Sequence, residues 1–264
     1  MHMHFTYLKA IIFILSVNVN LAAAFNVTPA QSHPTIIFPG GGIFFYWQAG
    51  AITYLRDEAG YDFSALPLSG ASAGALAATL TATNTDFEAA TNLALDFCDE
   101  YSIWERPLGL FGVWGGIIEQ WLDELLPEDA VQMVDGRLSL LVTPVPSFKK
   151  HRVSNFENKQ DLIACNMASV HLPWFLDKKP TAKFRDSLVI DGSFLSETPK
   201  DYIHQPCETI VLDWQKDPVM AEKSNEIIKL VGRDGIWSIF EQGREFAKNA
   251  DMKGEYKLLY KTES

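Results

Sequence analysis

Residues 65–81 read ALPLSGASAGALAATLT and contain a GxSxG motif in which Gly70 and Gly74 flank Ser72. The apolar run 65–69 predicts a short strand, and the alanine- and leucine-rich residues 73–81 favour a helix. At such a junction the motif places its serine on a sharp turn, with the hydroxyl above the sheet and near the positive end of the helix. The two glycines let strand and helix approach without a side-chain collision. Ser72 is therefore the candidate nucleophile, and a structural turn of small residues is the alternative interpretation.

Three consecutive glycines, Gly40, Gly41 and Gly42, follow another predicted strand at residues 35–38. Backbone N–H groups in a glycine loop can converge on an anion. For a serine nucleophile that anion is the tetrahedral oxyanion of acyl transfer. The chain lacks the GxxxxGK[ST] pattern of a phosphate loop. We therefore predict that the three glycines form an oxyanion hole, an interpretation that depends on Ser72.

The pair Asp191-Gly192 directly follows the apolar residues 188–190. A carboxylate in this place lies at the carboxyl end of a predicted strand, the edge where α/β proteins build their sites. By itself an Asp-Gly pair favours a simple turn. Together with Ser72 it makes Asp191 the candidate base. Because an ordinary carboxylate has a pKa of about 4, burial must raise the basicity of Asp191 for this role.

The remaining apolar runs alternate between strand and helix patterns. This alternation predicts one α/β domain, a three-layer α/β/α sandwich with a mainly parallel central sheet covered on both faces. Residues 35–215 are expected to form the catalytic domain and residues 216–264 to add helices packed on the same domain, with a short hinge near residues 233–235. Further strands are predicted at 138–143, 188–190 and 209–212, and helices at 47–58, 86–98, 117–125, 159–168 and twice after Pro218.

The N-terminus has the pattern of a targeting segment. Lys9 precedes the apolar residues 10–17, and Ala22, Ala23 and Ala24 supply small residues for a signal peptidase. We expect residues 1–24 to be a signal peptide and residues 25–34 a short linker or transit segment. Cleavage before Phe25 resembles the presequences of complex algal plastids, so the expected destination is a plastid or the secretory and endomembrane route. An uncleaved anchor is the other alternative.

Composition restricts the partners and cofactors. The 22 basic and 33 acidic side chains give a formal charge of -11, which excludes nucleic acid as a probable class of partner and disfavours strongly anionic membranes at low salt. Cys98, Cys165 and Cys207 form no CxxC pair and have no ligand-like spacing with histidine. We therefore expect reduced thiols, no metal and no cofactor.

The three motifs and their order resemble the patatin-like phospholipases, and residues 70–76 look especially like the triacylglycerol-lipase branch. The resemblance extends over about residues 35–199. It includes residues 154–156 and 168–173 and also Pro199, eight residues after Asp191. It implies a dyad of Ser72 and Asp191 without histidine, with the glycine loop as oxyanion hole. It also implies phospholipid, galactolipid or triacylglycerol esters as substrates at a membrane or lipid-droplet surface, with no obligatory protein partner.

This chain departs from the family pattern at four positions. Phe44 and Phe45 follow the glycine loop where the family often has a basic residue or glycine, which could weaken the loop. Ser193 stands where the family usually has glycine or alanine, and Glu197 replaces a common asparagine. The last two changes remove no catalytic group.

Alternatives to the dyad hydrolase remain open at this stage. His151, His171 or His204 could complete a Ser-Asp-His esterase, an acyl-enzyme could pass its acyl group to an alcohol, and the fold could serve as a non-catalytic lipid-binding protein. Residues 103–118 are rich in tryptophan, leucine and glycine. We expect this segment to be mainly a packed connection, with part of it near the acyl channel.

Overall fold

The computed structural model of this protein describes residues 33–262. The predicted signal peptide at residues 1–24, and most of the predicted linker at 25–34, lie outside the described residues. The described helices all fall short of the length and continuous apolarity that a bilayer crossing requires.

A seven-stranded mixed sheet forms the centre of the fold, in the order β5-β6-β3-β2-β1-β7, with β4 paired to β3. Strands β3, β2, β1 and β7 are parallel neighbours, whereas β4 and β6 pair antiparallel with β3, and β5 with β6. The sequence did not signal β4 and β5, which are three residues long. The strands are β1 (Thr35–Phe38), β2 (Leu68–Gly70), β3 (Leu138–Pro144), β4 (His151–Val153), β5 (Ala182–Phe184), β6 (Ser187–Ile190) and β7 (Thr209–Val211).

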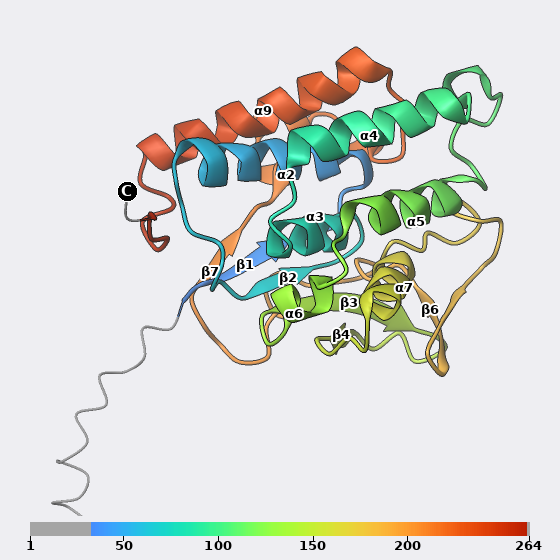
Figure 1. The fold of residues 1–264 in the computed structure, drawn as a ribbon, viewed down its shortest axis with the longest axis horizontal. Helices are drawn as coiled ribbons and strands as arrows, with labels where there is room; N and C mark the ends of the chain where they lie inside the picture. Colours follow the sequence, from blue (N-terminus) through green and yellow to red (C-terminus); the bar gives the residue numbers. More distant parts are fainter. Residues whose placement is uncertain (1–32, 263–264) are drawn as a thin grey trace, which may run out of the picture. The chain divides into compact units, whose positions relative to one another are not determined.

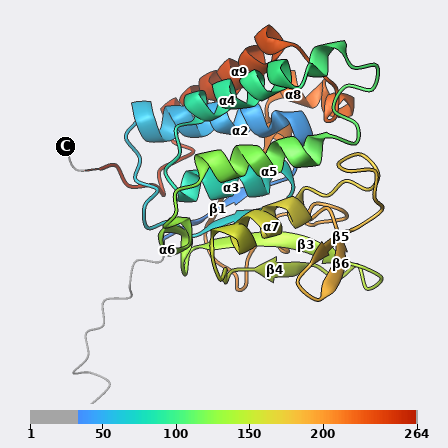
Figure 2. The same cartoon turned by 45° about the vertical axis from the view of Figure 1, so that its right-hand side comes forward.

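Helices lie around this sheet (Figures 1 and 2). Three of them start at a side-chain cap: Asp86 accepts from the backbone of Glu88 and Ala89, Asn158 from Asp161, and Asp217 from Val219. The helices are α2 (Phe45–Ile52), which continues as a π-helical segment (Thr53–Glu58), α3 (Ala73–Ala82), α4 (Phe87–Glu100), α5 (Trp114–Leu125), α6 (Ala130–Val134), α7 (Lys159–Ser169), α8 (Pro218–Ala221) and α9 (Arg233–Met252), with short 3-10 turns at Gly42–Phe44, Ile103–Glu105, Trp214–Lys216 and Ser224–Glu226.

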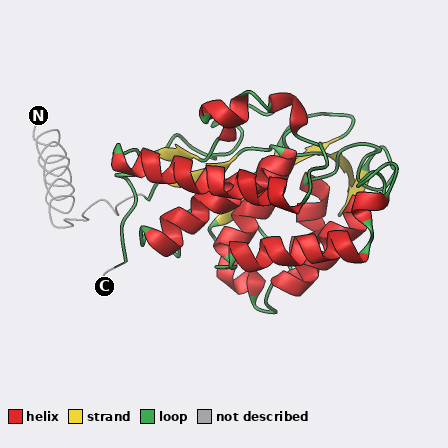
Figure 3. Ribbon diagram, turned by 90° about the horizontal axis from the view of Figure 1, so that it is seen from above, coloured by secondary structure: helices red, strands yellow, loops and turns green. Residues whose placement is uncertain are grey.

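The arrangement is a mixed, mostly parallel central sheet with helices around it, and it confirms the predicted α/β class. Seen from above, helices cover much of the sheet (Figure 3). The strand that leads to Asp191, β6, is not a member of the parallel set, since Thr143 and Pro144 of β3 pair antiparallel with Ile190 and Val189. Residues 233–235, where a short hinge was considered, form the first turn of α9.

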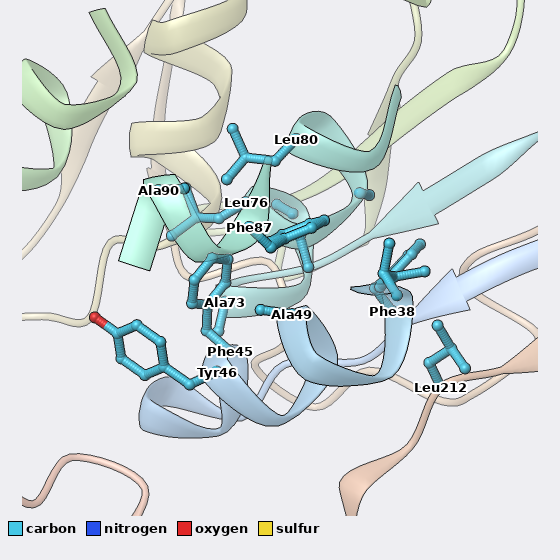
Figure 4. Packing of buried hydrophobic residues seen from close by; sticks show 14 of the residues in the cluster. Phe38, Phe45, Tyr46, Ala49, Ala73, Leu76, Leu80, Phe87, Ala90 and Leu212 are labelled. Carbon is cyan, nitrogen blue, oxygen red and sulfur yellow. The ribbon is translucent and has the colours of Figure 1, made fainter. Parts of the chain in front are cut away.

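The main core lies between the sheet and the helices. Phe45 of α2, Leu76 of α3 and Phe87 of α4 meet there (Figure 4). Helix α9 packs directly on α2, and a Cβ added to Gly50 or Gly243 would lie 1.9 Å from a carbonyl oxygen of the other helix. A smaller cluster joins Ile37 of β1 and Leu141 of β3 with Ala71 and Tyr202, which lie outside the strands. Both sides of the central strands are therefore covered by apolar contacts.

Candidate active site

Ser72 lies on the turn between β2 and α3. Its backbone has φ 55° and ψ −132°, a conformation that non-glycine residues rarely adopt. Two glycines make the turn sterically feasible: a Cβ on Gly70 would lie 2.2 Å from the carbonyl oxygen of Gly74, and a Cβ on Gly74 would lie 2.0 Å from that of Phe38. The Ser72 backbone N–H donates to Ser169 Oγ at 3.0 Å. The motif is therefore a strained strand-to-helix elbow.

Asp191 follows β6 and faces Ser72 directly. Ser72 Oγ donates to Asp191 Oδ2 at 2.6 Å. The other carboxylate oxygen, Oδ1, accepts from the Ser193 backbone N–H at 2.8 Å and from the Ser193 hydroxyl at 2.6 Å. The backbone of Asp191 is held as well, since its N–H donates to the His171 carbonyl at 2.9 Å and its carbonyl accepts from Thr143 Oγ1 at 2.8 Å. Both carboxylate oxygens are thus fixed in orientation.

The environment makes this carboxylate more basic than an ordinary aspartate. Asp191 is 2 % exposed and Ser72 is 7 % exposed. Burial raises the pKa of Asp191, because removal from water disfavours the charged form. Hydrogen bonds from Ser193 and Ser72, and the positive charge of Lys150, act in the opposite direction but do not cancel the rise. The direction of the shift suits a group that accepts a proton from a hydroxyl.

The glycine loop comes close to the side chains of Ser72 and Ser193. A Cβ on Gly40 would lie 2.6 Å from Ser193 Cβ and 3.1 Å from Ser72 Cβ. Gly42 has φ +54°, and a Cβ there would lie 1.9 Å from the Ile227 carbonyl oxygen. Within residues 33–262 the backbone N–H groups of Gly41, Gly42 and Ala73 have no hydrogen-bond partner. Donors of this kind beside a serine are what an oxyanion requires.

Phe44 and Phe45, which depart from the family pattern, are core residues. The Phe44 ring packs on Trp214 with centroids 4.3 Å apart, and the Phe45 ring meets Trp121 edge to face at 5.6 Å. Both side chains are buried. They therefore anchor the end of the glycine loop in the core.

An apolar cavity of about 120 Å³ adjoins Ser72. Its walls are almost entirely hydrocarbon, so it suits an acyl chain better than a polar group. Several residues of the 103–118 segment line it, whereas Ile103 of the same segment is buried in the core away from the cavity. The segment is thus both a packed connection and a cavity wall. Wall residues include Tyr46, Leu76, Trp104, Leu110, Trp114 and Trp121.

The three histidines considered as alternatives have other surroundings. His171 is buried with its Nε2 3.3 Å from the Lys179 carbonyl, and His204 Nδ1 lies 3.2 Å from Arg152 Nη2. His151 is exposed on β4. No histidine side chain within residues 33–262 hydrogen-bonds to Ser72 or Asp191. The geometry therefore favours direct proton transfer between the serine and the aspartate.

Sequence reasoning missed several residues that hold the site together. Ser169 binds the Ser72 N–H through its hydroxyl and the Gly192 N–H through its carbonyl. Lys150 Nζ donates to Thr143 Oγ1 at 2.8 Å. No local motif marks these residues, because the hydrogen bonds of Ser169 to Ser72 and Gly192, and of Lys150 to Thr143, form only when the chain has folded. Ser193 was noticed as a departure, but its hydrogen bonds to Asp191 were not foreseen.

The described residues contain no group of three or more His, Cys, Asp or Glu side chains arranged to hold a metal. Cys98 and Cys165 are buried, and burial raises the pKa of both thiols, that of Cys98 to about 11. Cys207 is exposed, with its Sγ 3.4 Å from Thr35 Oγ1. Within the described residues, none of the three thiols hydrogen-bonds to Ser72 or Asp191.

One protein family and several known proteins match this chain. A model described as "Patatin-like phospholipase" matches residues 36–203. The mouse "Omega-hydroxyceramide transacylase" is 30% identical over 177 residues, which cover 66% of this chain and 29% of that protein. The bovine "Patatin-like phospholipase domain-containing protein 2" is 27% identical over 173 residues, covering 65% and 35%. The chain thus matches about a third of the length of these relatives.

Among solved structures, VipD from Legionella pneumophila aligns with a TM-score of 0.43 and 16% identity, over 68% of this chain and 49% of that one.

Proposed function

This chain belongs to the patatin-like phospholipase family, and we propose that it is a lipid acyl hydrolase in which Ser72 is the nucleophile and Asp191 the base. The observation that carries the proposal is the 2.6 Å hydrogen bond from Ser72 Oγ to Asp191 Oδ2. It lies beside an apolar cavity and beside backbone N–H groups without partners. Nucleophile, base, oxyanion donors and acyl site are therefore adjacent.

In the proposed reaction Ser72 Oγ attacks the ester carbonyl carbon while its proton passes to Asp191 Oδ2. The tetrahedral oxyanion accepts hydrogen bonds from the N–H groups of Gly41, Gly42 and Ala73. When the intermediate collapses, the carbon–oxygen bond to the alcohol breaks and the alcohol takes the proton from Asp191. Asp191 then removes a proton from water, which attacks the acyl-enzyme. Release of the fatty acid returns the proton to Ser72.

The cavity supports substrates with a long hydrocarbon chain. Few polar groups line its wall, so binding energy would come from burial of the acyl chain rather than from a head group. Glycerolipid esters, whether phospholipid, galactolipid or triacylglycerol, fit this description. They would be taken from a membrane or lipid-droplet surface.

Acyl transfer to an alcohol is the second candidate function. It is favoured by the mouse relative, whose name describes a transacylase and which is 30% identical over the matched region. The same acyl-enzyme serves both outcomes, because an acceptor hydroxyl can replace water in the second attack. The acceptor would decide the product.

The experiment is a product analysis with purified protein. We expect fatty acid release from mixed glycerolipid vesicles, covalent labelling by a lipophilic organophosphonate, and loss of both in Ser72→Ala. Lysolipid acceptors added to the same reaction separate the two functions, since a transacylase would form diacyl product at the expense of free fatty acid. Undiminished labelling of Ser72→Ala would place the nucleophile elsewhere and overturn the proposal.

We also propose that about the first 24 residues are removed and that the protein enters a plastid or the secretory route. The support is the small-residue site ending at Ala24 after an apolar run. N-terminal sequencing of the native protein tests this. A mature chain that begins at Met1 and is extracted with cytosolic proteins would contradict it and leave the catalytic proposal intact.

A further inference from the structure

Residues 227–231 follow the region matched by the family model, yet they line the same cavity as Ser72. Their backbone is bound to the glycine loop, since the Ile43 N–H donates to the Ile227 carbonyl at 2.8 Å. The close approach of Gly42 to that same carbonyl leaves no room for a side chain. This segment is therefore part of the mouth of the site.

The outer side of this mouth is apolar. Ile228 is 53 % exposed and Leu108 is 67 % exposed, and together with Leu230 they line a second hollow next to the cavity. A Cβ on Gly109 would lie 3.0 Å from Leu230 Cδ2, so the two segments are in contact. Trp174, which is 58 % exposed, precedes Phe175, another residue of this hollow. We call Leu108, Trp174, Ile228 and Leu230 the apolar rim.

Three chain segments build the apolar rim: residues 105–113, 172–181 and 222–233. The first of these connects α4 to α5, and the third leads into α9 (Figure 1). The Gly112 N–H donates to the Phe175 carbonyl at 2.7 Å, which ties the first two segments together. The aliphatic stem of Lys178 packs over Gly112 at the same place. The rim is thus a continuous surface of three connected loops.

The charge of these segments differs from that of the whole chain. They contain six basic side chains (Arg106, Lys178, Lys179, Lys223, Lys229 and Arg233) against four acidic ones (Glu105, Asp177, Glu222 and Glu226), in a chain of formal charge -11. Of the six, Lys179 pairs with Asp177, Lys229 with Glu226, and Arg233 with Asp96 and Asp99 of α4, while Lys178 has no ion pair within the described residues. Apolar side chains flanked by lysines are the pattern of a surface that inserts between lipid head groups, with ammonium groups near the phosphates. The long-range repulsion from the acidic remainder is screened at physiological salt.

We propose that the apolar rim is the surface by which this protein docks on a phospholipid bilayer. Leu108, Trp174, Ile228 and Leu230 would enter the interface, with Lys178 at the level of the phosphates. A lipid leaving the bilayer there meets the cavity at once, because Ile228 and Leu230 line both. This proposal rests on the proposed function, which gives the protein a reason to bind a bilayer. The binding itself can be measured without catalysis.

The test is co-sedimentation of Ser72→Ala protein with phosphatidylcholine vesicles, with and without phosphatidylglycerol. We expect binding, and in the added double variant Leu108→Ser/Trp174→Ser an affinity lower by about tenfold or more. Both side chains are exposed and lie outside the cavity wall that contains Ser72, so the fold should remain intact, as a thermal melt verifies. A second double variant, Ile228→Ser/Leu230→Ser, should lose binding in the same way.

The matched control is Met252→Ser, which removes an equally exposed apolar side chain (70 %) at the far end of α9. The helix begins at Arg233, so this control lies about 28 Å along α9 from the rim. It should bind as the parent does. Equal binding by the rim variants, equal loss in Met252→Ser, or attachment that requires a protein rather than pure lipid would overturn the proposal. If the unsubstituted protein, which retains Ser72, bound vesicles but hydrolysed no ester, the proposed function would be rejected and the docking surface would be supported.

Discussion

Ser72 and Asp191 reach the same point of the molecule by different constructions. Ser72 lies on the turn that follows β2, a strand of the parallel set, and its elbow depends on Gly70 and Gly74, which closely approach each other and β1. Asp191 directly follows β6, which runs antiparallel to β3, and its orientation depends on Thr143, His171 and Ser193. The nucleophile is placed by a short stretch of backbone, whereas the base is placed by partners from several elements.

The two halves of the site therefore depend on different properties: backbone shape around Ser72, and the electrostatic environment around Asp191. The Ser72 side requires a strained backbone and no space for additional carbon atoms, so its sensitive positions are glycines. The Asp191 side requires a buried carboxylate whose pKa is set by the groups around it, so its sensitive positions are polar side chains. Changes on the Ser72 side should therefore affect folding first, and changes on the Asp191 side should affect turnover or its pH dependence.

The largest effect is expected for Asp191→Asn. The amide has nearly the same shape but cannot take the proton of Ser72, so kcat should fall by about 10⁴-fold, as in related acyl transfer when the acid–base machinery is disabled. Steady-state ester hydrolysis measures it, and circular dichroism and a thermal melt check the fold. Full activity of a folded Asp191→Asn protein would remove Asp191 from the mechanism.

The second effect tests the glycine side with a pair of helical glycines. A Cβ on Gly74 would lie 2.0 Å from the Phe38 carbonyl oxygen, whereas a Cβ on Gly116, in α5, would meet nothing within 4 Å. Gly74→Ala should lower the free energy of unfolding by about 3 kcal/mol or more through overpacking. Gly116→Ala should raise it by about 0.5–1 kcal/mol, because alanine is the better helix former. Urea unfolding measures both, and similar values for the two variants would contradict the elbow geometry.

A smaller effect is expected for Ser193→Ala on the aspartate side. The base must be deprotonated, so kcat/KM falls as the pH drops through the pKa of Asp191, which burial raises above about 4. The Ser193 hydroxyl lowers that pKa. Its removal should therefore shift the acid limb of the kcat/KM profile to higher pH. A limb that stays in place or moves to lower pH would show that this hydroxyl does not act on the base.

The smallest effect is expected for the histidines. His151→Gln, His171→Gln and His204→Gln should each keep most of the ester hydrolysis activity, because none of these side chains hydrogen-bonds to Ser72 or Asp191 within the described residues. His171 is buried, so its variant needs a melt to separate lost folding from lost chemistry. If His204→Gln alone matched the loss in Ser72→Ala while folded, a Ser-Asp-His arrangement would replace the dyad.

Local sequence was sufficient to predict the strand, elbow and helix around Ser72. Alternation of apolar runs with helix-forming segments gave the α/β class and most element positions to within a few residues, because burial and propensity act over short windows. Strands β4 and β5 were not predicted, because three residues are too few to show a strand pattern of apolar and polar side chains. The three glycines at 40–42 and the pair Gly70 and Gly74 were recognisable because only glycine permits such close contacts of the backbone.

Chain direction and long-range partners could come only from the tertiary structure. The apolar run before Asp191 is only three residues long, which is too short to distinguish a continuous parallel-strand pattern from an alternating antiparallel one, so the direction of β6 could not be predicted. Ser169, Thr143 and the segment at 227–231 act on the site across distances of tens of residues or more. Their roles arise from hydrogen bonds and packing that exist only after the chain has folded, because a polar side chain gains its function from the buried group it meets.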